Sequence, residues 1–183
     1  RYGDTTVALL PIEFLHDGLP QLELVSEWVP PEHESPNFPD VDAEGMGDVL
    51  ASLMARPNVA SKEWWGRSYD HEVIAQSVIK PFCGVNHDAP GDAAVIAPIH
   101  GGTQGAVISC GITPRYSDID TYAMAAASID EAVRNAVCVG VDLERMAGLD
   151  NFCWPDSVES EKTPDGRYKL AQLVRANRAI DDV

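Results

Sequence analysis

Residues 30–48 constrain the fold more than any other part of the sequence. They contain four prolines and six Asp or Glu residues, and neither Lys nor Arg. Proline lacks the backbone N–H that helices and sheets use. The segment also has few apolar side chains, and their burial cannot offset the entropy that is lost when the chain is ordered. We therefore expect a mobile, acidic linker that divides the chain into residues 1–29 and residues 49–183.

Residues 1–29 have the pattern of short strands around a turn. An apolar run at 5–15 is followed by the turn signal HDGLP at 16–20, and apolar and polar residues then alternate from Leu22 to Val29. We expect these strands to be the tail of a domain whose other strands lie upstream. The first residue is not Met, and we expect the chain to be a fragment of a longer protein.

Two helices are expected directly after the linker. Apolar residues at helical spacing predict a helix that Asp48 caps and Pro57 ends. Residues 61–63, Ser-Lys-Glu, then open a second and shorter helix that carries Trp64 and Trp65.

Three apolar runs, at residues 72–82, 92–99 and 105–112, predict a β-sheet. The Gly-Gly-Thr turn at 101–103 joins the last two runs as a hairpin. Because both runs are almost continuously apolar, we expect burial on both faces of the sheet. A chain that leaves one of these faces open is expected to form a homodimer through it.

The longest expected helix covers residues 121–139. This segment is rich in alanine and lacks proline, Asp120 or Thr121 is its cap, and Gly140 follows its end. The remaining expected elements are a short strand, a turn and a helix, at residues 144–152, 154–168 and 169–180. Helices mixed with antiparallel strands predict an α+β fold.

The charge of the chain excludes two classes of partner. Thirteen Lys and Arg residues against twenty-nine Asp and Glu residues give a net charge of −16. Such a surface repels nucleic acid and anionic membranes. A phosphate ligand would need a bound cation or a nest of backbone N–H groups to offset this charge.

The four cysteines predict a reduced protein. They are widely spaced without a CxxC pair, and two of them, Cys110 and Cys138, lie in apolar runs where cysteine behaves as a small hydrophobic residue. No signal peptide and no apolar run long enough to span a bilayer is present in the sequence. We therefore expect a cytoplasmic location.

Three residues are candidates for a cation site. Asp92 follows the flexible Gly91 at the start of an apolar strand, where backbone N–H groups can meet a phosphate. Glu131 and Asn135 are four residues apart and share one face of the long helix. Their oxygens are ligands that Mg²⁺ prefers. From the pattern alone, an Asp at the start of a strand is more often a turn residue, and such a helical pair is more often a pair of surface residues.

Further candidates lie in expected loops. Asp150 and Asn151 follow an expected strand, which is where α/β proteins place ligand groups, although an Asx turn explains them as well. Arg115 is a candidate phosphate contact or a plain loop residue. No pair of histidines has zinc-binding spacing, and no phosphate-binding or dinucleotide-binding glycine motif occurs in the sequence.

Six blocks in order resemble one family, the formylglycinamide ribonucleotide amidotransferases. The blocks are ASKEW (60–64), YDHEV (69–73), PGDAAVI (90–96), TPRY (113–116), EAVRNAVCVG (131–140) and LDNFCWPD (149–156). Each block alone is weak evidence, and the resemblance covers the chain from about residue 50. It implies a ferredoxin-like, two-layer α+β domain that begins the second of two synthetase copies. The partners it implies are the first synthetase copy and a glutaminase domain.

The resemblance also implies a chemistry. The family uses ATP and Mg²⁺ to activate the formyl amide of its substrate, and ammonia released from glutamine then displaces phosphate. The resemblance assigns Asp92, Glu131 and Asn135 as magnesium ligands and Gly91 as a nucleotide contact. The first copy has Asp at the position of Asn135, and an amide cannot neutralise metal charge. The site is therefore expected to hold ATP or ADP as an auxiliary, structural nucleotide, and the chain alone is expected to be inactive.

Two other interpretations remain open at this point. One is another ATP-dependent enzyme of the same superfamily, such as a selenophosphate synthetase or a thiamine phosphate kinase, in which the block LDNFCWPD would not be expected. The other is a binding or scaffold module without catalytic activity, whose site only stabilises the fold.

Overall fold

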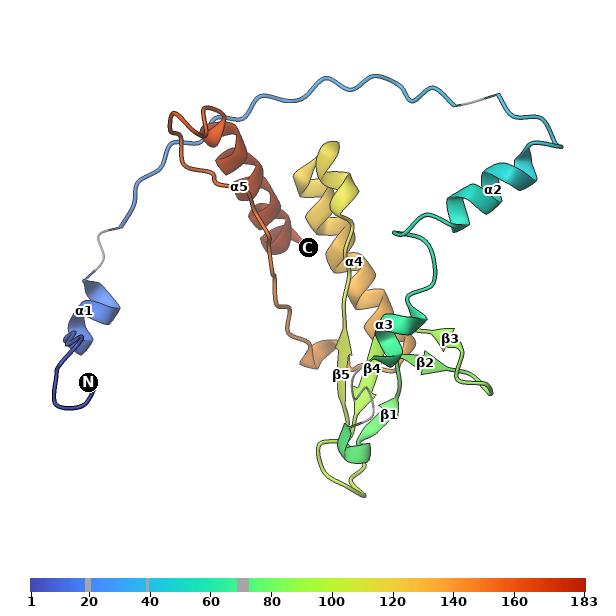
Figure 1. Cartoon of the computed structure of the whole chain (residues 1–183), viewed down its shortest axis with the longest axis horizontal. Helices are drawn as coiled ribbons and strands as arrows, with labels where there is room; N and C mark the ends of the chain where they lie inside the picture. The colour runs from blue at the N-terminus through green and yellow to red at the C-terminus, as the bar shows by residue number, and fades with distance from the viewer. Residues whose placement is uncertain (19–20, 39, 69–72) are drawn as a thin grey trace. The chain divides into compact units, whose positions relative to one another are not determined.

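The computed structural model describes residues 1–18, 21–38, 40–68 and 73–183. The chain forms two compact units, one of Arg1–Trp28 with Pro155–Ala171 and one of Val29–Trp154 with Gln172–Val183. The described elements appear in Figure 1; they are α1 (Ile12–Asp17), α2 (Met46–Met54), α3 (Glu63–Arg67), η1 (Val73–Ala75), β1 (Ser77–Ile79), β2 (Phe82–Cys83), β3 (Ala89–Pro90), β4 (Ala93–Ile96), β5 (Ala106–Ser109), η2 (Pro114–Asp118), α4 (Thr121–Cys138), η3 (Leu143–Arg145) and α5 (Gly166–Asp182).

The first unit contradicts the expected strands of residues 5–29. Its described N-terminal residues form the short helix α1 and an isolated bridge between Tyr2 and Thr5. A strand needs a neighbouring strand to pair with, and the contact described for this segment is instead a stacking of aromatic rings. Trp28 stacks on Tyr168 of α5 with ring centroids 6.0 Å apart. Of the expected turn at 16–20, the last two residues lie outside the described chain.

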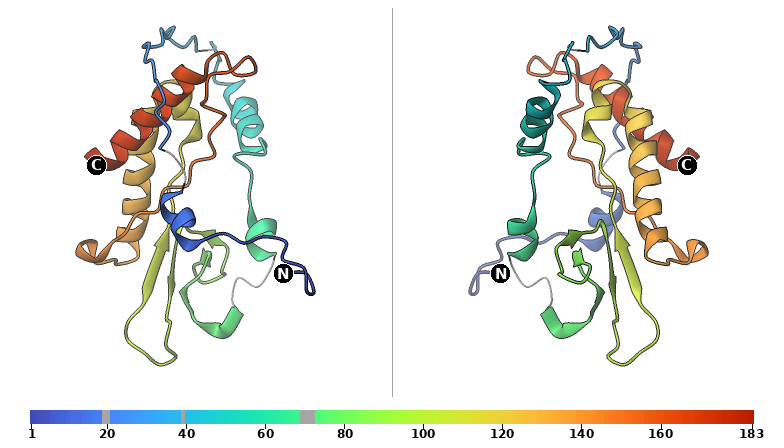
Figure 2. Two further views of the ribbon diagram at one scale, coloured as in Figure 1. Left: turned by 90° about the vertical axis from the view of Figure 1, so that its left-hand side faces the viewer. Right: turned by 90° about the vertical axis from the view of Figure 1, so that its right-hand side faces the viewer.

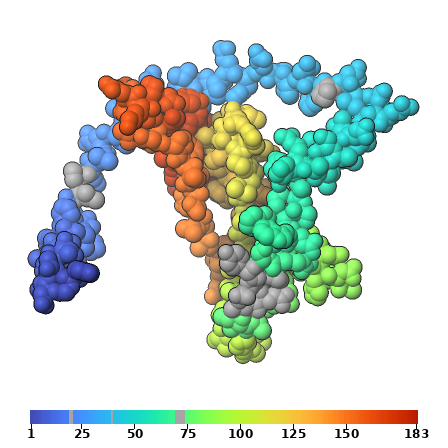
Figure 3. All heavy atoms as spheres, viewed as in Figure 1, coloured from blue at the N-terminus to red at the C-terminus, as the bar shows by residue number. Residues whose placement is uncertain are grey.

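In the acidic segment that follows, residues 30–38 have neither helix nor strand and are exposed. Figure 3 shows it, in the blue part of the colour range, as a single thickness of chain. Helix α2 then begins at Met46, and Gly45 occupies its N-cap position. The expected cap, Asp48, is wrong because it lies inside the first turn; Asp42 instead accepts a hydrogen bond from the N–H of Gly45 at 2.8 Å.

Helix α3 begins at Glu63, within the predicted opening, and carries Trp64 and Trp65 as predicted. It packs against β2. The guanidinium of Arg67 lies 4.5 Å from the centre of the Phe82 ring. A β-carbon at Gly66 would come within 2.6 Å of the same ring, so a larger residue there would displace the Phe82 side chain. The Trp64 and Trp65 side chains pack edge to face with centroids 4.7 Å apart and are exposed.

The predicted hairpin is confirmed. Strands β4 and β5 pair antiparallel, with Ala93 opposite Ser109 and Ile96 opposite Ala106. β1 pairs antiparallel with the other edge of β4, and the sheet order is β1-β4-β5. The run expected as one strand at 72–82 is divided instead among η1, β1 and β2, and residue 72 lies outside the described chain.

The apolar runs predict burial on both faces only once the sheet has a partner, and an open apolar face in the chain by itself. Helix α4 packs against β5 and β4. Val78 and Ile108 of the sheet remain 62% and 60% exposed. The apolar runs therefore exceed what the described elements cover.

Helix α4 forms as predicted and packs on α5. The Asp120 carboxylate caps it by accepting hydrogen bonds from the N–H groups of Tyr122 and Ala123. The core between the helices consists mainly of small residues, which allow close approach; its members are Met124, Ala125, Ala176 and Ala179. The two helices lie side by side in both views of Figure 2.

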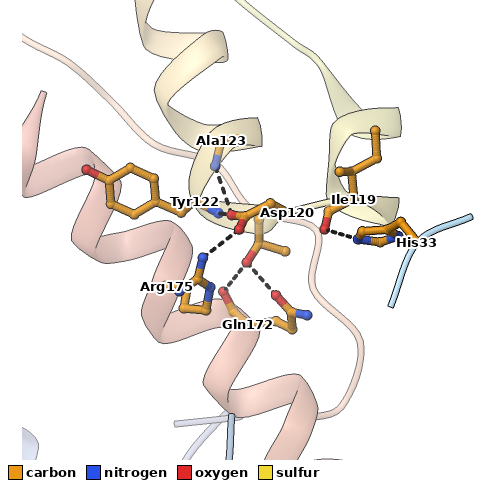
Figure 4. A network of polar contacts seen from close by, with 8 residues as sticks. His33, Ile119, Asp120, Tyr122, Ala123, Gln172 and Arg175 are labelled. Carbon is orange, nitrogen blue, oxygen red and sulfur yellow. Dashed lines mark hydrogen bonds and ion pairs between the residues drawn. The ribbon is translucent and has the colours of Figure 1, made fainter. Parts of the chain in front are cut away.

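Figure 4 shows the polar contacts that join these helices. The Arg175 guanidinium donates to the Asp120 carboxylate at 2.6 Å. The hydroxyl of Thr121 lies 2.9 Å from the backbone oxygen of Gln172 and 2.6 Å from its side-chain oxygen. These contacts fix where α4 begins relative to α5. The predicted helix at 169–180 is confirmed and starts earlier, at Gly166.

The strand expected at residues 144–152 is wrong. After η3 this segment has an irregular backbone, and Leu149 is 94% exposed. Only Phe152 within it packs on the core between α4 and α5. Gly148 and the polar residues that follow give the segment too little apolar surface to hold it at a sheet edge.

Helices and small antiparallel sheets together give an α+β fold. All four cysteines are free thiols, and Cys110 and Cys138 are exposed rather than buried as their apolar neighbours suggested. Among the described residues, no helix combines the length and the apolar character needed to cross a membrane.

Candidate functional site

The segment that leaves β5, residues 109–113, lies directly on α4. The Ser109 hydroxyl donates to the backbone oxygen of Ala132 at 2.9 Å. Further along, the Thr113 hydroxyl lies 2.8 Å from the Ser128 hydroxyl, and the Thr113 N–H donates to that same oxygen at 3.2 Å. These bonds run along one face of the helix, one turn after another.

Glu131 and Asn135 lie on that same face, and both are half-buried. The N–H of Ile112 donates to Oε2 of Glu131 at 2.9 Å. The side-chain amide of Asn135 donates to the backbone oxygen of Cys110 at 3.0 Å. The two side chains therefore turn toward residues 110–112 rather than outward.

Asp92 is connected to the same segment through the sheet. Its backbone oxygen accepts a hydrogen bond from the N–H of Cys110 at 3.4 Å. Cys110 thus contacts Asp92 through its N–H and Asn135 through its carbonyl oxygen. At this corner of the fold, Cys110 joins the backbone of Asp92 to the helix face that carries Glu131 and Asn135, and no described contact joins the Asp92 carboxylate to either of those side chains.

The oxygens at this corner are suited to a hard cation. Asn135 donates through Nδ2, which leaves its Oδ1 as an acceptor. Glu131 accepts through Oε2 and retains Oε1. Asp92 is exposed at the strand mouth. Carboxylate and amide oxygens are ligands for Mg²⁺, which commonly keeps water and phosphate oxygens in its remaining positions.

The charge at this corner is modest. In the described part of the chain, no group of three or more His, Cys, Asp or Glu side chains is placed to hold a metal. The candidate set has two carboxylates and one amide, so phosphate oxygens would have to complete the coordination of a cation. Gly91, whose N–H donates to the backbone oxygen of Pro81, is exposed beside Asp92.

The other predicted site residues lie on separate surface segments. Arg115 is in η2, and its guanidinium lies 3.5 Å from the Asp118 carboxylate with the side chain 89% exposed. Asp150 and Asn151 are exposed in the irregular segment after η3. No described contact joins these three residues to Asp92 or Glu131.

One acidic residue on α4 serves as an internal comparison. Asp130 precedes Glu131, is exposed, and forms the predicted ion pair with Arg134 at 2.7 Å. Neighbours in sequence, Asp130 and Glu131 thus differ completely in surroundings: one faces solvent and the other faces the exit of β5.

Two residues of this region were not identified from the sequence. Ser128 lies one turn before Glu131, at the spacing that places both on one helix face, and this spacing was the available signal. Gly111 carried no such signal, because a glycine after a strand is usual in loops. Of the sequence blocks, YDHEV lies mostly outside the described residues.

Comparisons with known proteins agree with the sequence blocks. The chain is 36% identical over 176 residues to the phosphoribosylformylglycinamidine synthase subunit PurL of Ignicoccus hospitalis, an alignment that covers 94% of this chain and 22% of that protein. The PurL subunit of Methanopyrus kandleri is 33% identical over 85% of the chain and 20% of its own length. The chain is PurL-like.

Other curated PurL subunits give the same result, among them that of Rhodopseudomonas palustris, which is 32% identical over 87% of this chain. The PurL-like chain spans about a fifth of the length of the curated relatives it matches. No family model matches the chain, and no solved structure matches it.

Proposed function

We propose that this PurL-like chain contributes a Mg²⁺–nucleotide site to an ATP-dependent ligase. That ligase converts formylglycinamide ribonucleotide and ammonia derived from glutamine to formylglycinamidine ribonucleotide, a step of purine biosynthesis. The observation that supports the proposal is that the Glu131 and Asn135 side chains both bond to residues 110–112, and that Cys110 of this segment pairs with the backbone of Asp92. The similarity to PurL subunits supports the choice of reaction.

The roles of the side chains follow from their chemistry. Asp92 and Glu131 would hold Mg²⁺ through carboxylate oxygens, and Asn135 would add a neutral amide oxygen. ATP supplies the phosphoryl group for the reaction, and Mg²⁺ neutralises its phosphates. Gly91, at the strand mouth, would let phosphate oxygens approach the backbone, and Arg115, Asp150 and Asn151 are proposed as outer nucleotide contacts from their loops.

The neutral Asn135 favours an auxiliary role. An amide, unlike a carboxylate, does not neutralise charge on the metal, and we take this site to suit retention of a nucleotide better than phosphoryl transfer. A second candidate function is therefore a structural nucleotide-binding module. The remaining synthetase copy and the glutaminase domain would then supply the reactive residues.

We further propose that residues 49–183 belong to a ferredoxin-like domain that pairs through its sheet. The exposed Val78 and Ile108 on the described sheet support an absent partner. In the parent enzyme the partner would be the first synthetase copy, and in the isolated chain a second copy of this chain.

The test is calorimetric titration of the chain with ADP in the presence of Mg²⁺. Binding is expected for the natural chain, and Glu131→Gln is expected to weaken it by about tenfold or more, because a tenfold loss requires only about 1.4 kcal/mol of lost charge interaction. Asp130→Asn is the matched control and should bind as the natural chain does. Equal effects of the two substitutions, or no binding by the natural chain, would contradict the proposal.

A further inference from the structure

We infer that Gly111 is a positioning residue that sets the geometry of Asp92, Glu131 and Asn135, and this inference rests on the proposed Mg²⁺–nucleotide site. Gly111 itself would not touch the ligand. It allows the backbone that leaves β5 to lie directly on α4, and that contact determines where the three proposed ligands stand relative to one another.

The contact at Gly111 is closer than any other residue could make. A β-carbon at this position would lie 1.9 Å from the backbone oxygen of Ser128 and 2.8 Å from the backbone nitrogen of Ala132. Both neighbours are backbone atoms of a helix, so neither can rotate away as a side chain would. Any other residue at position 111 must therefore displace the segment from α4.

The bonds that orient the proposed ligands lie on either side of this contact. Ile112, immediately after Gly111, donates to Glu131, and Cys110, immediately before it, accepts from Asn135. At 2.9 Å and 3.0 Å both hydrogen bonds have ordinary lengths, and a separation increased by about 1 Å would break them.

The same segment is also bonded to the backbone of the third proposed ligand, Asp92, which precedes β4. Cys110 pairs with Asp92 through its N–H, so the position of Asp92 depends on the path of the β5 exit. Displacement at Gly111 would therefore change the distance between a ligand on the sheet and two ligands on the helix. A cation held by both elements is sensitive to that distance, because Mg²⁺ demands near-ideal octahedral geometry.

Thr113 and Ser128 hold the segment in place at its other end. The Thr113 hydroxyl lies 3.0 Å from the backbone oxygen of Met124 and 2.8 Å from the Ser128 hydroxyl. Substitution of Thr113 is therefore an independent way to loosen the segment without adding atoms. Thr113→Val keeps the shape of the side chain and removes the hydroxyl, and Thr113→Ser keeps the hydroxyl.

The experiment compares the chain with Gly111→Ala and with Gly148→Ala, the matched control, since a β-carbon at Gly148 would meet nothing within 4 Å. The affinity for ADP is measured with and without Mg²⁺, and circular dichroism and the thermal midpoint without nucleotide report the fold. The ratio of the two affinities is the decisive quantity. A general loss of structure would weaken both, whereas loss of ligand geometry would remove the gain that Mg²⁺ provides.

For Gly111→Ala we expect this gain to fall by about tenfold or more, the size of effect seen when residues that orient metal ligands are replaced. Gly148→Ala should keep the full gain. Thr113→Val should reduce the gain and Thr113→Ser should restore it, and this pair decides the question if Gly111→Ala does not fold.

The outcomes separate the two proposals. If the natural chain gains no ADP affinity from Mg²⁺, the proposed function fails and the positioning role fails with it. If Glu131→Gln abolishes the gain while Gly111→Ala and Thr113→Val both keep it, the site stands and the positioning role of Gly111 is wrong. The positioning role is also wrong if Gly111→Ala lowers affinity equally with and without Mg²⁺ while Thr113→Val leaves the gain intact.

Discussion

Helices α2 and α4 each carry an apolar face, but of the two only α4 has a partner for it among the described residues. Met124, Ala125 and Ala136 of α4 are buried. On α2 every large apolar side chain is exposed; these are Met46, Val49, Leu50, Leu53 and Met54. The sequence pattern of α2 is therefore that of a helix that packs, while the described chain leaves it uncovered.

The N-terminal ends of the two helices also differ, because only that of α4 is capped by a side chain that contacts another helix. The Asp120 side chain caps α4 and also binds Arg175 of α5, so one residue joins the cap to the packing. Helix α2 has nine residues and no side-chain cap among the described residues. A helix of that length is marginal without packing. The comparison shows that periodicity predicts a helix, whereas its stability depends on what it meets.

The largest difference in stability between the two helices should come from removing one apolar side chain from each. Met124→Ala is expected to lower the free energy of unfolding by about 2–3 kcal/mol, because it leaves a cavity between α4 and α5. Met54→Ala, the same substitution on α2, should change it by less than about 0.5 kcal/mol. Chemical denaturation followed by circular dichroism measures both. Similar losses for the two variants would mean that the face of α2 is covered after all.

An intermediate effect is expected at the helix ends. Asp120→Ala should cost about 1–2 kcal/mol of unfolding free energy, since it removes the cap of α4. Asp48→Ala on α2 should lie within about 0.5 kcal/mol of the natural chain, because Asp48 caps nothing. A large cost at Asp48 would show that α2 is stabilised through its first turn, unlike a helix that depends on packing alone.

The smallest effect concerns pH. Burial alone would raise the pKa of Asp120, but hydrogen bonds from the Ala123 N–H, the Arg175 guanidinium and the Tyr122 N–H outweigh it and hold the pKa below its ordinary 3.8. Folding thus lowers this pKa, so the carboxylate contributes stability above its unfolded pKa and loses it as the pH falls through the folded value.

Asp120→Asn should therefore lose less stability than the natural chain when the pH is lowered from about 5 to about 3. Asp130→Asn provides the control from the exposed side of the same helix. Urea unfolding at several pH values measures the difference. Parallel pH profiles for the natural chain and Asp120→Asn would show that the ion pair with Arg175 does not contribute to acid stability.

Local features of the chain were predictable from the sequence. The hairpin of β4 and β5, the short helix α3 and the ion pair of Asp130 with Arg134 were predicted and are confirmed. A cap at Asp120 or Thr121 was predicted, and Asp120 is the cap. Each depends on residues close together in the chain. The strands expected at 5–29 and 144–152 failed because a strand depends on a neighbour that its own sequence does not specify.

The candidate site divides along the same line. The sequence by itself determined that Glu131 and Asn135 share a helix face, because helical geometry places residues four apart together. Only the tertiary structure decided that this face meets the exit of β5 and that Cys110 connects it to Asp92. The need for glycine at position 111 could not be predicted from the sequence either. It arises because the backbone of α4 lies against this position, and no local sequence pattern encodes that approach.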